Sequence, residues 1–127
     1  METTPSGLLL SRDLMFTVKI TSTAKELGRK VKAVGRVEQA EEFLAGNRPR
    51  AVFVDLTAGE LASRESLTKL MALAPDVPFI AFGPHVEVEA FQAARDAGCR
   101  EVMPRSKFTA QLPDLIRAHL GDEPTAG

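Results

Sequence analysis

The stretch Arg50-Ala51-Val52-Phe53-Val54-Asp55-Leu56 decides the fold of this sequence. Apolar residues run from Ala51 to Val54 without a polar break, which is typical of a strand buried on both faces of a parallel sheet. The run ends at Asp55, and the loop Thr57-Ala58-Gly59-Glu60 follows. Because binding and chemistry in open parallel α/β sheets gather at the carboxyl ends of the strands, Asp55 is the first candidate functional residue. The alternative is that Asp55 only caps the turn after the strand.

Length and composition indicate one globular domain. The chain has 127 residues, of which 44% are hydrophobic and 26% are charged, and its formal net charge of −1 does not point to nucleic acid or a membrane surface. Cys99 is single, and His85 and His119 are far apart, so neither a disulfide nor a zinc signature is expected. No apolar run approaches the roughly 20 residues of a membrane span. Met1 to Gly7 does not resemble a signal peptide, so we expect a cytoplasmic protein.

Strand-like apolar runs alternate with helical patterns along the chain. We expect strands at 7–10, 31–34, 51–56, 77–82 and 101–103, and helices after Asp13, at 37–44, 61–73 and 86–97, and from near Thr109 to Leu120. Polar tails at 1–6 and 122–127 would flank a single domain at 7–121. The alternation predicts a five-stranded parallel sheet, doubly wound, with helices on both faces and right-handed crossovers.

The first predicted helix has apolar residues on two sides. Asp13 is placed to cap it, and a stripe at helical spacing, Phe16, Ile20, Ala24 and Leu27, would face the core. Leu14 and Val18 fall nearly opposite that stripe, where they either cover a sheet edge or are exposed for a partner. The segment from Arg12 to Arg36 holds seven basic and two acidic residues. We interpret it as a solvated face, with a weakly anionic partner as the alternative.

The order of elements and several stretches resemble response-regulator receiver domains. These stretches are Arg50–Leu56 with its terminal Asp55, Val77–Phe82 and Ala97–Arg105, and the similarity covers about Leu8 to Leu120. The resemblance implies a flavodoxin-like, receiver-like fold. It also implies that Asp55 matches the aspartate that accepts a phosphoryl group in receivers, next to Mg²⁺ held by that aspartate and by an acidic pair after the first strand.

The residues around Asp55 depart from the receiver pattern. The resemblance places the acidic pair on Ser11 and Arg12, and Asp13 comes one position late. Mg²⁺ needs hard oxygen ligands, and a guanidinium in place of a carboxylate repels it. The family's hydroxyl residue after the fourth strand falls on Gly83. Its lysine after the fifth strand falls on Arg105, which keeps the charge but not the geometry of lysine.

These replacements predict a pseudo-receiver. We expect a stand-alone protein–protein interaction module in signal transduction, of the kind found beside two-component systems, that is not an enzyme. We expect no metal, no cofactor and no Mg²⁺-dependent phosphorylation of Asp55, because phosphoryl transfer depends on metal and positioning. The alternative is a degenerate receiver that still uses Asp55 as its phosphoacceptor. The partner is expected to be a signalling protein, with neither a membrane nor nucleic acid as the target.

Other classes of protein fit less well. A nucleotide-binding enzyme needs a glycine-rich turn after the first strand, and Leu10-Ser11-Arg12-Asp13 has no glycine. A hydrolase built from Ser11, His85 and Asp55 would lack the usual turn around its nucleophile. Nucleic acid binding is disfavoured because the chain has neither Trp nor Tyr to stack on bases.

Two further expectations concern charge. A carboxylate buried in a cleft needs a partner, so we predict that Arg12 or Arg105 forms an ion pair with Asp55 in place of the metal. The alternative is that both arginines point to solvent and Asp55 accepts backbone N–H bonds from the next loop. Receivers commonly pair through the fourth helix, fifth strand and fifth helix, so a weak homodimer is expected there. That face would carry Arg95, Glu101, Arg105 and Arg117 beside Ala90 and Ala94.

Overall fold

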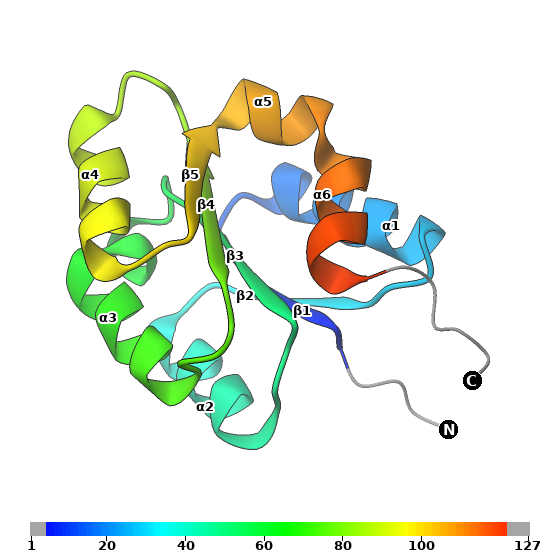
Figure 1. The fold of residues 1–127 in the computed structure, drawn as a ribbon, viewed down its shortest axis with the longest axis horizontal. Helices are drawn as coiled ribbons and strands as arrows, with labels where there is room; N and C mark the ends of the chain where they lie inside the picture. Colours follow the sequence, from blue (N-terminus) through cyan, green and yellow to red (C-terminus); the bar gives the residue numbers. More distant parts are fainter. Residues whose placement is uncertain (1–4, 122–127) are drawn as a thin grey trace.

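The protein is a parallel sheet covered by helices on both faces, as predicted (Figure 1). The computed structural model describes residues 5–121. Its strands, in sheet order β2-β1-β3-β4-β5, are β1 Gly7–Leu10, β2 Val31–Val34, β3 Ala51–Asp55, β4 Phe79–Gly83 and β5 Glu101–Pro104. Its helices are α1 Leu14–Glu26, α2 Val37–Gly46, α3 Arg64–Leu73, α4 Val88–Ala97, α5 Arg105–Ala110 and α6 Leu112–Leu120, with a short 3₁₀ turn, η1, at Gly59–Ala62.

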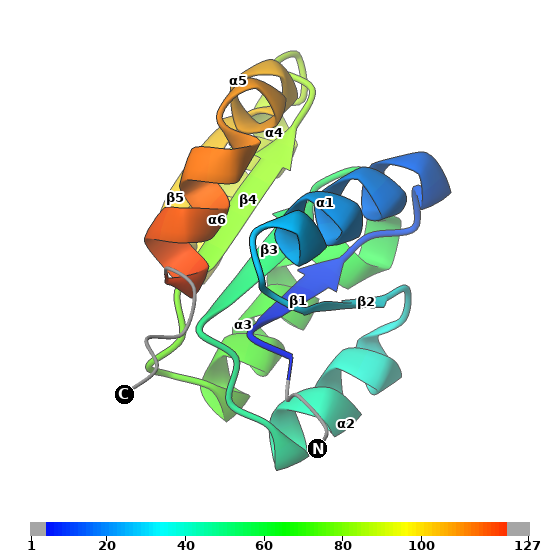
Figure 2. The same cartoon turned by 90° about the vertical axis from the view of Figure 1, so that its right-hand side faces the viewer.

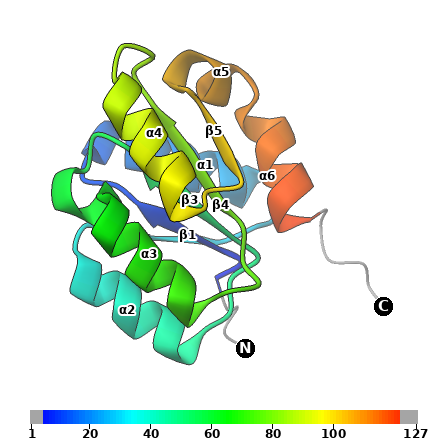
Figure 3. The ribbon, with the colours of Figure 1, turned by 60° about the vertical axis from the view of Figure 1, so that its left-hand side comes forward.

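Each face of the sheet has its own core. Helices α1, α5 and α6 cover one face (Figure 2), and α2, α3 and α4 lie side by side on the other (Figure 3). Alternate strand residues point to opposite faces, so Phe53 packs with α1, α5 and α6 while Val52 and Val54 pack on the other side. Burial of one such side chain contributes roughly 1.5–3 kcal/mol, and the apolar runs of the central strands supply much of the stability.

A cluster of phenylalanines fills the first core directly below the carboxyl ends of the strands. The rings of Phe82 and Phe108 stack with centroids 4.0 Å apart, and Phe16 and Phe53 pack against Phe108 from two further elements. These contacts fix α1 and α5 relative to β3 and β4. The loops that hold the candidate site are therefore attached to a rigid base.

The segment predicted to form one last helix forms two helices. The prediction placed its start near Thr109, but α5 begins at Arg105 and ends at Ala110, and α6 starts at Leu112. Pro113 explains the break, because it has no N–H to donate to the carbonyl of Thr109 and its ring disfavours a continuous helix. Pro113 lies in the first turn of α6, where its missing N–H costs little.

Two other helix predictions differ in detail. The helical spacing of Val88, Phe91 and Ala94 predicts that all three pack in the core, but Val88 begins α4 and is 70% exposed. The predicted helix at 61–73 is divided into η1 and α3. Ser63 lies between them, and its side-chain oxygen accepts a hydrogen bond from the backbone N–H of Ser66. This N-cap starts α3 as a separate helix.

Backbone hydrogen bonds tie Ser6 to the start of the domain. Ser6, assigned to the tail, donates its backbone N–H to the carbonyl of Lys30, and its own carbonyl accepts from the N–H of Arg50. The tail residues 1–4 and 122–127 lie outside the described residues. Within residues 5–121, every helix is too short or too polar to cross a bilayer.

The single cysteine and the two histidines each have a defined position in the structure. Cys99 is partly buried against the core beneath α4, and burial raises the pKa of its thiol to about 12, which leaves little reactive thiolate at neutral pH. His85 is exposed in the loop before α4. His119, near the end of α6, lies with Nε2 3.2 Å from Oε2 of Glu101 on β5.

Candidate functional site

The register of the sheet places Ser11 beside Asp55. Leu10 pairs with Val54, so the next residues, Ser11 and Asp55, lie at the same level of the sheet. Both side chains are buried, with Ser11 6% and Asp55 1% exposed. The Ser11 hydroxyl donates to Oδ2 of Asp55 at 2.8 Å, and the Ser11 oxygen accepts from the backbone N–H of Asp13 at 3.1 Å.

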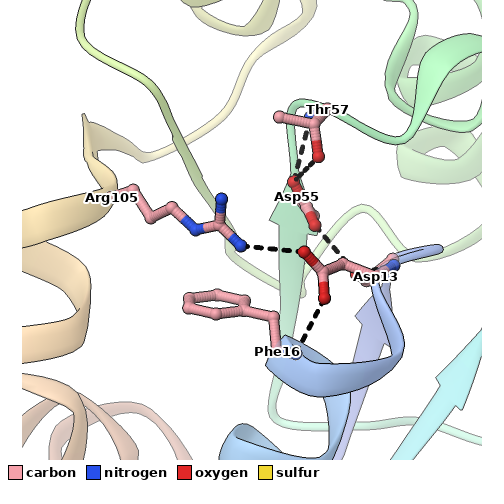
Figure 4. Close-up of polar contacts among 6 residues, drawn as sticks. Asp13, Phe16, Asp55, Thr57 and Arg105 are labelled. Carbon is pink, nitrogen blue, oxygen red and sulfur yellow. Dashed lines mark hydrogen bonds and ion pairs between the residues drawn. The ribbon is translucent and has the colours of Figure 1, made fainter.

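The other carboxylate oxygen of Asp55 is bound by the loop that follows β3. Oδ1 accepts from the backbone N–H of Thr57 at 2.9 Å and from its hydroxyl at 2.7 Å (Figure 4). The carboxylate thus receives three hydrogen bonds from neutral donors on both sides. A buried polar group needs such partners, and here the chain itself supplies them.

The predicted ion pair between Asp55 and an arginine is wrong. Figure 4 shows the guanidinium of Arg105 pointing at Asp13, where Nη2 lies 3.0 Å from Oδ2. The guanidinium of Arg105 also lies over the ring of Phe16, 4.4 Å from its centroid. Arg12 is exposed, and its Nε donates to the carbonyl of Gly35 at 3.2 Å. Because hydroxyls already satisfy Asp55 in a closed site, the arginines pair with groups at the rim.

The alternative prediction for Asp55 is confirmed in part. The backbone N–H of Thr57 does bind it, as that alternative expected, but the hydroxyls of Ser11 and Thr57 were missed. A signal for the contact with Thr57 was present, because an Asp side chain often binds the backbone N–H two residues later and so brings the side chain of that residue near. The role of Ser11 depends on strand register, which no local pattern reveals.

Asp13 belongs to the helix and does not join Asp55. Its Oδ1 accepts from the backbone N–H of Phe16 at 2.9 Å, which makes it the predicted N-cap of α1. This hydrogen bond, followed by the one from Arg105, lowers the pKa of Asp13 from its usual 3.8. Both carboxylate oxygens of Asp13 therefore have partners within the fold.

Gly83 leaves little room for a side chain at the position of the receiver hydroxyl residue. A Cβ atom built there would lie 3.0 Å from Cβ of Leu56 and 3.5 Å from Cε1 of Phe91. Leu56 follows Asp55, which pairs with Phe82, so Leu56 lies level with Gly83 across the sheet. The leucine after β3 therefore occupies the space that a side chain at position 83 would need.

The residues of this site do not fit Mg²⁺. Octahedral Mg²⁺ sites use carboxylate oxygens that are free to coordinate, whereas Ser11 directs a hydroxyl proton at Oδ2 of Asp55. Within the part of the chain that the structure describes, no three side chains of His, Cys, Asp or Glu are grouped so that they could hold a metal ion. A relay through Ser11 and His85 is also not formed, because the serine hydroxyl donates directly to Asp55.

The fold is that of response-regulator receiver domains, as solved structures show. A CheY-like receiver domain protein from Methanospirillum hungatei superposes with a TM-score of 0.78 at 14% identity, covering 93% of this chain and 94% of that one. The receiver domain of a sensor histidine kinase from Pseudomonas aeruginosa, solved with magnesium in its active-site cleft, gives 0.77 at 19% identity, covering 94% of this chain and all of that one.

A third similar structure is a response regulator from Burkholderia pseudomallei with a phosphorylated aspartic acid, at a TM-score of 0.75 and 15% identity. It covers 91% of this chain, which spans 66% of that one. The sequence matches no family model and no curated protein. At these identities the solved structures establish the fold, and the chemistry rests on the residues present.

Proposed function

We propose that this protein is a pseudo-receiver, an interaction module of a signalling pathway that works without Mg²⁺-dependent phosphorylation of Asp55. One observation carries the proposal: both oxygens of the Asp55 carboxylate are hydrogen bonded by the chain's own Ser11 and Thr57. The protein then presents one permanent arrangement of the loops around β3 to its partner.

The hydrogen bonds oppose phosphorylation in two ways. Attack on a phosphoryl donor requires a carboxylate oxygen that can approach phosphorus in line, and Asp55 is 1% exposed with its oxygens engaged. The transferred group also needs positive charge on its oxygens. Arg105, at the position of the receiver lysine, is bound to Asp13 and Phe16, and Arg12 is turned to Gly35.

The second candidate function is a degenerate receiver that is still phosphorylated on Asp55. It is favoured by the position of Asp55 at the carboxyl end of β3, and by the similar structure from Burkholderia pseudomallei that contains a phosphorylated aspartic acid. For this chain, phosphorylation would require Ser11 and Thr57 to release the carboxylate first. The two candidates therefore differ in a measurable reaction.

Treatment with acetyl phosphate and Mg²⁺, followed by intact-mass and peptide mass spectrometry, separates them. We expect no phosphorylated protein above the level of an Asp55→Asn control, which lacks the acceptor. A receiver known to accept phosphate, treated in parallel, shows that the reagent is active. Stoichiometric modification that maps to Asp55 would overturn the proposal and establish the second candidate.

A further inference from the structure

Three basic residues of the segment from Arg12 to Arg36 line one open groove at the amino-terminal edge of the sheet. The groove lies along the end of α1 and the start of β2, and its volume is about 730 Å³. Its polar lining comes from Thr21, Ser22 and Lys25 on α1 and from Arg29 and Lys30 in the loop that follows. No acidic side chain lines it among the described residues. We name this feature the α1–β2 groove.

Arg29 is a buried charge without a charged partner. It is 9% exposed, and its Nε donates to the carbonyl of Gly121 at 3.0 Å. Its Nη1 lies 3.5 Å from the carbonyl oxygen of Gly28, at the outer limit of a hydrogen bond. Within residues 5–121, no carboxylate lies within 4.0 Å of this guanidinium, and Nη2 has no acceptor. Since a buried charge is costly unless an opposite charge accompanies it, Arg29 needs an anion.

The free end of Arg29 is accessible and held in place. Every fully buried side-chain nitrogen or oxygen in the described part of the chain has a hydrogen-bond partner, so Nη2 can be reached from solvent. Gly28, with φ of 79°, turns the chain at the end of α1, and the backbone N–H of Arg29 then donates to the carbonyl of Ala24 at 2.8 Å. A donor fixed in this way loses little entropy when an anion binds.

Arg50 brings a second positive charge to the same edge. α1 and α6 pack side by side and both end there (Figure 1). Nη1 of Arg50 donates to the carbonyl of Leu120 at 3.2 Å, and it lies, like Nη2 of Arg29, next to the position that a Cβ atom on Gly121 would take. The end of α6 contributes about half a negative charge, which does not neutralise two guanidinium groups.

The acidic residue of α1 closest in sequence to the groove is Glu26. It is exposed beside Lys25 and offsets part of the charge of that lysine. Because successive helical residues are rotated by about 100°, Glu26 points away from Lys25, and it does not line the groove. The anion is therefore expected at Arg29, with Lys30 as the exposed cation next to it.

We propose that the α1–β2 groove binds a small phosphorylated molecule, with its phosphate group on Arg29 and Lys30 and its remainder along α1. A guanidinium group matches the geometry of phosphate oxygens. The hydroxyls of Thr21 and Ser22 donate to the carbonyl of Val18, so their oxygens are left to accept from a hydroxyl group of the ligand. The volume is in the range of small-molecule sites, about 300–1,000 Å³. The site does not depend on the proposed function.

Carboxylates of this chain and a membrane surface are less suited to the groove. Asp122 and Glu123 follow Gly121 in the sequence, but two carboxylates do not fill a groove of this volume that continues along α1 to Thr21. A flat anionic membrane does not reach into a groove whose central cation, Arg29, is 9% exposed. Both occupants are nevertheless included in the test.

The test titrates the intact protein with two phosphomonoesters, AMP and glucose 6-phosphate, and with inorganic phosphate and adenosine. We expect at least one phosphomonoester to bind saturably with a dissociation constant below about 1 mM. It should shift the backbone NMR signals of Lys25, Gly28 and Lys30 and the side-chain Nε–H signal of Arg29. Inorganic phosphate leaves the groove along α1 empty and should bind at least about tenfold more weakly. Adenosine, which lacks the phosphate, should not shift the Arg29 signal.

Matched variants localise the binding. Lys25→Gln/Lys30→Gln should weaken the phosphomonoester by about tenfold or more, because it removes two cations from the groove. Lys19→Gln/Lys32→Gln removes two exposed lysines that do not line the groove, and should weaken it by less than about twofold. Arg29→Lys keeps the charge but loses the guanidinium geometry, and should also weaken binding by about tenfold. Circular dichroism melts confirm that the variants remain folded.

Several results would overturn the inference. These are no saturable binding of any of the three anions, equal losses in the two double-lysine variants, or shifts centred away from Arg29. Equal affinity for inorganic phosphate and the phosphomonoesters would indicate an adventitious ion only.

Two further results would replace the inference with another occupant. If Asp122→Asn/Glu123→Gln raises the affinity for phosphomonoesters by about tenfold or more, the chain's own carboxylates occupy the site. Binding to phosphatidylglycerol vesicles that depends on Lys25 and Lys30, without binding of free phosphomonoesters, would indicate a membrane. Phosphorylation of Asp55 bears on the proposed function alone.

Discussion

At the scale of single residues, Asp55 and the hydroxyls of Ser11 and Thr57 satisfy one another's hydrogen bonds. The Ser11 and Thr57 hydroxyls have the carboxylate as their acceptor, so removing it leaves buried donors without a partner. A buried donor left unsatisfied costs about 1–3 kcal/mol, whereas exchanging one acceptor for another costs less. The stability of Asp55 variants therefore tests these hydrogen bonds independently of any phosphorylation of Asp55.

Asp55→Ala should lower the free energy of unfolding by about 1–3 kcal/mol. Asp55→Asn should lower it less, because its amide oxygen can still accept both hydrogen bonds from Thr57. Urea denaturation of the two variants and the wild type provides the comparison. A neutral or stabilising effect of Asp55→Ala would show that the hydrogen bonds to Ser11 and Thr57 do not stabilise the fold.

Restoring a hydroxyl at Gly83 should destabilise the protein. In Gly83→Ser, the new Cβ lies 3.0 Å from Cβ of Leu56, which cannot move without shifting the backbone, and overpacking of this kind costs about 1–3 kcal/mol. Gly46→Ser is the control, since a Cβ there has open space, and its stability should change by less than about 0.5 kcal/mol. Similar melting temperatures for both variants would contradict the crowding at Gly83.

The positions of the candidate-site residues were predictable from the sequence, but the contacts among their side chains were not. Asp55 was found because a polar residue ends an apolar strand, and Asp13 because it precedes a helical stripe. The pairing of Arg105 was not predictable, because Arg12, Asp13 and Asp55 all lie near the same strand ends. Which partner an arginine selects depends on burial and on prior hydrogen bonds, and both are properties of the folded structure.

At the scale of elements, Asp13 joins α1 to α5. It caps the first turn of α1 through Phe16 and binds Arg105, the first residue of α5. Since the pKa of Asp13 is lowered in the folded protein, its contribution to stability is present above pH 3.8 and is lost as the pH falls through the folded pKa. The contact between α1 and α5 is therefore sensitive to acid.

Arg105→Gln should raise the pKa of Asp13 but leave it below 3.8, because the hydrogen bond from Phe16 is the larger cause of the shift. NMR titration of the side-chain carboxyl of Asp13 measures this directly. Arg95→Gln, a change of an exposed arginine on α4, should leave the Asp13 titration unchanged. An unchanged Asp13 pKa in Arg105→Gln would show that the pair does not persist in solution.

The helices and strands were predictable where periodicity was strong. The stripe on α1 and the apolar run of β3 placed those elements correctly. The predictions failed at the last helix, because α5 had already begun at Arg105, before the helix that contains Pro113. They also failed at Val88, which has the spacing of a core residue but is 70% exposed. The hydrophobic pattern of the sequence does not resolve these two features, because they depend on packing in the folded protein.

At the scale of the whole molecule, the parallel sheet and its two helical layers follow from alternation and right-handed crossovers, as predicted. The face expected to form a homodimer differs from the expectation, since Ala94 is fully buried and Arg105 turns toward Asp13. Glu101 lies beside His119. A weak homodimer through α4, β5 and α6 stays a prediction, which sedimentation at high micromolar concentration would test.

Mg²⁺ titration followed by NMR tests most directly whether the hydrogen bonds from Ser11 and Thr57 close Asp55 to a metal ion. For the wild type, we expect no saturable shift of the Ser11, Asp55 and Thr57 amide signals at millimolar Mg²⁺. The double variant Ser11→Asp/Arg12→Asp, which restores the acidic pair, should acquire saturable binding, because it adds carboxylate ligands and removes a positive charge. Saturable Mg²⁺ binding by the wild type, centred on Asp55, would contradict the account.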